Sequence, residues 1–119
     1  MDKFELEERL IDFAVQSIEI SKLLPYDSLG RHLGSQLIRS GTSPALNYGE
    51  AQSAESRKDF VHKIKIILKE LRESLVCLKI MKRTISGRVK DQLDIAMNEC
   101  NELISIFVKS CKTAEQNQS

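Results

Sequence analysis

Residues 56–81, SRKDFVHKIKIILKELRESLVCLKIM, decide the fold of this chain. Apolar side chains recur every three or four positions after Phe60, which is the period of an α-helix that packs on one side. Ser56 stands three positions before Asp59, a spacing that resembles a capping box with aspartate in place of glutamate. The sequence therefore predicts one long amphipathic helix. Its expected apolar stripe comprises Phe60, Ile64, Ile67, Leu68, Leu71, Leu75 and Leu78.

Three further helical segments lie on either side of this one, over residues of about 4–23, 28–52 and 88–111. Asp27 or Ser28 can cap the second segment, and Gly87 suits a left-handed turn before the fourth. We expect an all-α, up-down-up-down antiparallel four-helix bundle. It occupies residues 1–112 as a single domain and is followed by a polar C-terminal tail over residues 113–119.

The composition fits one globular domain. The chain has 119 residues, of which 41% are apolar and 29% charged, and this balance excludes a disordered chain. No stretch approaches the roughly 20 apolar residues of a membrane span, and the acidic N-terminus lacks the apolar run of a signal peptide. We interpret Cys77, Cys100 and Cys111 as buried thiols in a reducing environment. A cytoplasmic protein with no membrane partner is expected.

Catalytic and metal-binding patterns are missing from the sequence. Di-iron bundles use two Glu-x-x-His pairs, and neither His32 nor His62 follows a glutamate by three positions. Cys77 and His62 lie about four helical turns apart, which is too far for a nucleophile and its base. Neither a phosphate-binding loop nor a nucleophile elbow occurs. We expect no enzyme activity, cofactor, metal or small-molecule substrate.

Positive charge concentrates in one segment. The chain has a formal net charge of +1, but most of its basic residues lie between positions 56 and 90. Six of them fall within about 80° of one helix face and form what we call the basic row. Such a row repels itself unless phosphate, the acids of a neighbouring subunit or solvent neutralises it, and the sequence leaves these three alternatives open. The basic row comprises Lys58, Lys65, Lys69, Arg72, Lys79 and Arg83.

The first helical segment is apolar on two opposite faces. One face contains Phe4, Ile11, Val15 and Ile18. A helix of an isolated bundle needs one apolar face, so a second one indicates contact with another subunit. We assign the subunit interface to the other face, which contains Leu6, Phe13 and Ile20.

Charged residues on the second and third segments are expected to meet between the helices. If the intervening turn centres near Ser53, antiparallel packing brings Arg39 within one helical turn of Glu70. We predict a partly buried ion pair between them, with Gln36 or Glu73 nearby. The full structural polar network that we predict comprises Arg39, Asn47, Glu50, Glu70 and Glu73.

A family resemblance covers nearly the whole chain. Residues 35–51, SQLIRSGTSPALNYGEA, together with SxxDFxxK from Ser56 and LKExxES from Leu68, resemble small four-helix-bundle proteins encoded in intervening sequences of bacterial large-subunit ribosomal RNA genes. The resemblance implies an up-down-up-down bundle that assembles as a pentameric ring. It also implies a similarity to the accessory protein of diversity-generating retroelements, which is basic and binds nucleic acid.

Together these observations predict a non-enzymatic oligomeric scaffold or adaptor that contacts RNA without sequence preference through the basic row. The expected partners are other copies of the same chain, in the pentamer that the resemblance implies, and RNA. The alternative is a protein-interaction module whose basic row meets acidic faces of partner subunits.

Overall fold

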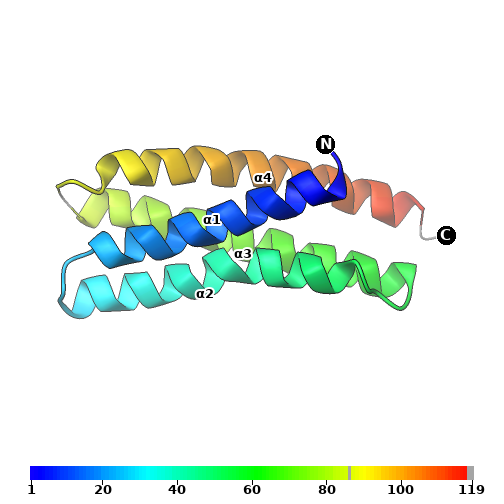
Figure 1. The fold of residues 1–119 in the computed structure, drawn as a ribbon, viewed down its shortest axis with the longest axis horizontal. Coiled ribbons are helices and arrows are strands. Elements are labelled where there is room, and N and C mark those ends of the chain that lie inside the picture. The colour runs from blue at the N-terminus through cyan, green and yellow to red at the C-terminus, as the bar shows by residue number, and fades with distance from the viewer. Residues whose placement is uncertain (86, 118–119) are drawn as a thin grey trace.

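Four helices account for nearly all of the residues that the computed structural model describes, which are 1–85 and 87–117. They are α1 (Lys3–Leu23), α2 (Ser28–Ala51), α3 (Arg57–Thr84) and α4 (Lys90–Gln116). Each helix runs antiparallel to the one before it, and the bundle measures 49 × 22 × 21 Å (Figure 1). The expected all-α four-helix fold is confirmed.

Side-chain oxygens cap the first three helices. Asp2 accepts a hydrogen bond from the backbone N–H of Glu5 at 2.9 Å, and Asp27 accepts one from Gly30 at 2.8 Å. Ser56 accepts one from Asp59 at 3.0 Å, as its spacing predicts. These caps satisfy N–H groups that have no partner within the helix, so short polar residues in the sequence determine where the helices begin.

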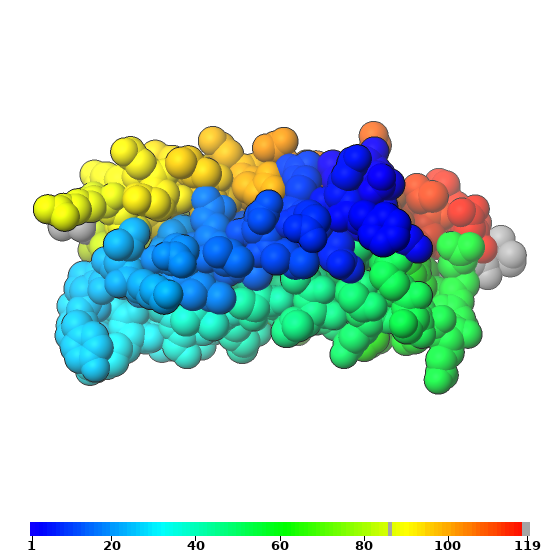
Figure 2. All heavy atoms as spheres, viewed as in Figure 1, coloured from blue at the N-terminus to red at the C-terminus, as the bar shows by residue number. Residues whose placement is uncertain are grey.

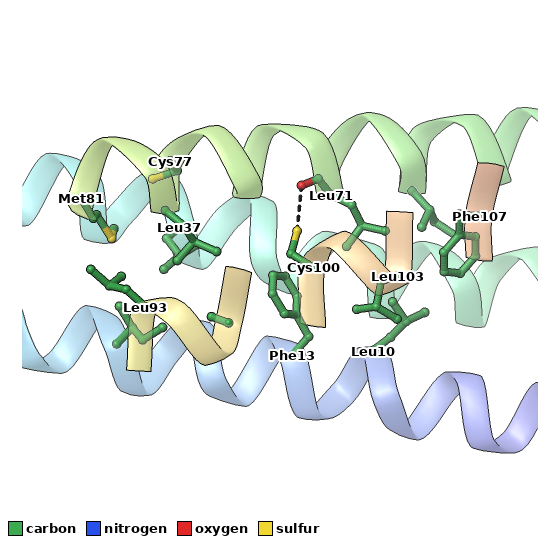
Figure 3. Packing of buried hydrophobic residues seen from close by; sticks show 14 of the residues in the cluster. Leu10, Phe13, Leu37, Leu71, Cys77, Met81, Leu93, Cys100, Leu103 and Phe107 are labelled. Atoms are coloured by element: carbon green, nitrogen blue, oxygen red, sulfur yellow. Dashed lines mark hydrogen bonds between the residues drawn. The ribbon is translucent and has the colours of Figure 1, made fainter. Parts of the chain in front are cut away.

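The core is one continuous apolar cluster between the four helices (Figure 3). The expected stripe on α3 is correct at its centre, where Ile64, Ile67, Leu71 and Leu78 are fully buried. Phe60, Leu68 and Leu75 are only partly buried at its edges. The core face of α3 is instead completed by Val61, Cys77 and Met81.

The two ends of α4 differ from the prediction. Gly87 adopts a positive φ of 103°, as the expected left-handed turn requires, and α4 begins at Lys90. Ser86 and residues 118–119 of the expected tail lie outside the described residues. The boundary at residue 112 is wrong, because α4 continues to Gln116 and buries Ala114. One small apolar side chain in a polar sequence was too weak a signal to extend the helix.

Helices α1 and α2 approach closely at Gly41. A Cβ atom placed there would lie 2.2 Å from Ser17 Oγ and 2.6 Å from Ser17 Cβ. The Ser17 hydroxyl is buried and donates to the Phe13 carbonyl oxygen at 2.9 Å, so it has little freedom to move. The glycine is therefore needed for close helix packing.

We expect Gly41→Ala to lower the free energy of unfolding by about 1–2 kcal/mol, because overpacking outweighs the gain in helix propensity. Gly49→Ala is the matched control, since a Cβ atom at this position of the same helix meets nothing within 4 Å. It should stabilise the protein by up to about 1 kcal/mol. Urea denaturation of Gly41→Ala and Gly49→Ala measures both changes in the free energy of unfolding. Equal changes would contradict the close approach of α1 and α2 at Gly41.

Candidate functional site

The basic row follows the outer face of α3, and all six of its side chains are exposed. Lys65 Nζ lies 3.8 Å from a carboxylate oxygen of Glu115 on α4, which is a weak contact between two half-exposed groups. The other five make no ion pair within residues 1–85 and 87–117. The row is therefore an open cationic surface about seven helical turns long.

Apolar side chains interrupt this cationic surface. A shallow depression on α3 is lined by three cations, Lys65, Lys69 and Arg72, by the carboxylate of Glu73 and by two apolar residues, Leu68 and Val76. Val76 is 56% exposed. Its position was available from the sequence, because Val76 follows Lys58 by five whole helical turns and so lies in the row itself. We call this depression with its three cations the α3 face.

The predicted ion pair between α2 and α3 is confirmed. Arg39 Nη1 donates to Glu70 at 2.9 Å, and Arg39 Nη2 donates to Glu73 and, at 3.4 Å, to Gln36. The Arg39 side chain is half exposed, whereas only 12% of the Glu70 side chain is exposed. The hydrogen bond from Arg39 lowers the pKa of Glu73, and the same bond raises the pKa of Arg39.

Asn47 and Glu50 do not join this network. Asn47 donates to the backbone oxygen of Ser43 at 3.0 Å, one turn earlier in α2. Glu50 accepts from Lys63 at 2.9 Å, near the other end of the helix pair. Both residues belong to the quoted family motif, but antiparallel packing carries them further from Glu70 with each turn of α2.

We expect Arg39→Ala to destabilise the protein by about 1 kcal/mol, because solvent screens a half-exposed ion pair. Arg72→Ala, which removes an arginine without an ion pair in the described residues, is the control and should have less effect. Folding lowers the pKa of Glu73, so the stabilisation from its ion pair is lost as acid protonates the carboxylate. The difference in the free energy of unfolding between wild type and Arg39→Ala should therefore shrink as the pH falls below about 4. Urea denaturation at pH 7 and pH 3.5 measures it.

The subunit interface that the sequence assigned to α1 is wrong. Leu6, Phe13 and Ile20 are 8%, 1% and 0% exposed and belong to the core of the single chain. The same side of α1 also carries the small residues Ala14 and Ser17, which let α2 approach. That pairing of large and small side chains was the missed signal for the inward face.

The outer face of α1 carries the other apolar set. Phe4 is 70% exposed, Val15 49% and Ile11 39%. Both faces of α1 are therefore apolar, as predicted, but the face that was expected to point outward is the one that points inward.

A groove between α1 and α4 was not foreseen. Val15 and Ile95 line it together with three acidic residues, Asp12, Glu99 and Glu102, and we call it the α1/α4 groove. Arg9 donates to Glu99 from Nε at 3.0 Å and lies 3.7 Å from Glu102. One arginine beside three carboxylates leaves the groove acidic. The sequence separates these residues by about 90 positions, so no local pattern could reveal it.

The cysteines are suited to packing and not to catalysis. All three are buried free thiols, and burial raises the pKa of each. Cys100 Sγ donates to the Leu71 carbonyl oxygen at 3.1 Å (Figure 3). A thiol held in its protonated form is a poor nucleophile and metal ligand. Among the described residues, no three His, Cys, Asp or Glu side chains gather in a way that could hold a metal ion.

Comparison with known proteins gives the family. A model of the 23S rRNA-intervening sequence proteins matches residues 2–109. The chain belongs to this family. A crystal structure described as a protein with unknown function from the S23 ribosomal protein family of Bacteroides thetaiotaomicron VPI-5482 is 30% identical in sequence. It matches with a TM-score of 0.81 over 90% of this chain and 98% of that chain.

The comparison with curated proteins gave no match. Neither the intervening sequence protein family nor the Bacteroides structure is described by a catalytic activity. In the described part of the chain, no helix is both long enough and apolar enough to cross a membrane.

Proposed function

We propose that this intervening sequence protein is a non-enzymatic scaffold that works in the cytoplasm as a ring-like homo-oligomer. The observation that supports it best is the set of large apolar side chains on the outside of the bundle, among them Phe4, Val15, Val76 and Ile95, which are 49–70% exposed. Apolar side chains left at the surface of several helices favour contact with other protein chains. The family resemblance favours five copies.

The mass of the purified protein in solution tests this proposal. Light scattering at tens of micromolar should give a mass several times the 13.5 kDa of one chain, and five times if the ring is a pentamer. A single-chain mass at that concentration would refute the scaffold proposal.

A second candidate function is contact with RNA through the basic row. The six exposed cations on one face of α3 favour RNA contact, because positive charge attracts phosphate groups. Such contacts carry little sequence information. Binding to single-stranded RNA should weaken steeply with salt. Changing Lys65, Lys69 and Arg72 together to Gln should flatten the logarithmic salt slope by roughly two. Protein that binds no RNA at about 50 mM salt would exclude this function.

A further inference from the structure

The charges of the bundle are divided between opposite sides. Helix α3 carries nine basic and three acidic residues, whereas α1 and α4 each carry five acidic and three basic ones. Figure 1 shows α1 in front of α3, with α4 along the upper edge of the bundle. Helices α1 and α3 lie diagonally opposite, and no Cα atoms of the two approach within 8 Å. A cationic surface therefore points away from an anionic one.

The α3 face and the α1/α4 groove each contain two apolar side chains among their charged residues. The α3 face presents Val76 and Leu68 between its cations. The α1/α4 groove presents Val15 and Ile95, 49% and 60% exposed, between its carboxylates. Figure 2 shows the side of the bundle on which atoms of both α1 and α4 lie at the surface. Each surface combines a small apolar centre with a charged rim, as interfaces between proteins do. The rim of the α3 face is cationic apart from Glu73, which accepts a hydrogen bond from Arg39.

We propose that the α3 face of one copy docks into the α1/α4 groove of a second copy. Val76 and Leu68 then pack on Val15 and Ile95, and Lys65, Lys69 and Arg72 face the acidic rim. Asp12 and Glu102 supply most of that rim, because Arg9 donates hydrogen bonds to Glu99 but only lies 3.7 Å from Glu102. The proposal rests on the self-association proposed above and names the surfaces that perform it.

The placement of the two surfaces determines the type of contact. Different patches of one chain can only meet between copies, head to tail, so the contact repeats and forms a closed ring where the rotation from one copy to the next closes. The apolar centre of the α3 face favours a protein chain as its occupant. A phosphate backbone would neutralise the cations but would leave Val76 and Leu68 without a partner.

Charge reversal tests the contact. The first variant carries Lys65→Glu, Lys69→Glu and Arg72→Glu on α3. The second carries Asp12→Lys and Glu102→Lys in the groove. Each should raise the dissociation constant of the oligomer by about tenfold or more, because like charges then face each other across the interface. All five positions are exposed, so far-ultraviolet circular dichroism should show unchanged helix content.

Combining the two sets in one chain should restore self-association, because the exchanged charges are again opposite. The matched control is Arg88→Glu, Lys90→Glu and Lys112→Glu, which changes the net charge as much as the first variant at exposed positions outside both surfaces. It should leave the mass of the oligomer unchanged. Sedimentation velocity of the four variants and the wild type measures all of these effects.

The outcomes separate this inference from the scaffold proposal. A monomeric wild type refutes both. An oligomeric wild type whose mass is unaffected by either reversal refutes the docking alone and leaves the scaffold standing. If the first variant assembles normally but loses binding to single-stranded RNA, RNA is the occupant of the α3 face and the docking is refuted. Failure of the combined variant to reassociate while it remains folded also overturns the pairing.

Discussion

Phe13→Glu should prevent the chain from folding. Phe13 is 1% exposed and lies in the core beside Leu10 and Cys100 (Figure 3). Removing a buried aromatic ring costs about 3–5 kcal/mol, and a carboxylate without a partner in that place adds several more. A domain of this size has about 5–15 kcal/mol of stability, so the substitution uses most or all of it. Circular dichroism and thermal denaturation at pH 7 should show little cooperative unfolding.

Val15→Glu makes a similar change two positions later on the same helix. Val15 is half exposed on the outer face of α1, so the free energy of unfolding should change by about 0.5 kcal/mol or less. This variant should remain helical and fail to associate normally, because Val15 lies in the α1/α4 groove. If Phe13→Glu instead gave a folded single chain, Phe13 would be a subunit contact and the inward face of α1 would be misassigned.

The exchange of the two faces of α1 shows which part of the fold the sequence determines. The beginnings of α2 and α3 were predictable, because Asp27 and Ser56 bind backbone N–H groups only three positions away. The inward face of α1 was missed, because both faces carry large apolar side chains and only the small residues Ala14 and Ser17 distinguish the inner one. On that inner face Ser17 lies close to Gly41 of α2, a contact between residues 24 positions apart.

Among the candidate surfaces too, those that depend on nearby residues were predictable and those that join distant helices were not. All six members of the basic row were predictable, because they lie on one helix and the helical period places them on the same face. The Arg39–Glu70 pair was predictable from the antiparallel packing of consecutive helices joined by a short turn. The α1/α4 groove was not, because it joins the first and last helices, whose relative position depends on the packing of the whole bundle.

Alkaline pH should destabilise the protein through Cys100. This thiol is fully buried, and burial raises its pKa from 9.0 to about 12. The unfolded chain therefore loses the proton at a lower pH than the folded chain, so the unfolded state binds fewer protons between these values and stability falls as the pH rises. The stabilisation is complete below pH 9 and is lost towards pH 12. Its full size is about 4 kcal/mol.

Cys100→Ser isolates this contribution. The serine hydroxyl can donate to the Leu71 carbonyl oxygen, as the thiol does at 3.1 Å, but it does not ionise in this range. Urea denaturation at pH 8 and pH 10.5 should show wild type losing about 2 kcal/mol more than the variant. Cys111→Ser is the control and should keep most of the wild-type pH dependence, because Cys100 remains in place. Equal losses in wild type and Cys100→Ser would mean that the buried thiol does not limit alkaline stability, and other groups would have to account for it.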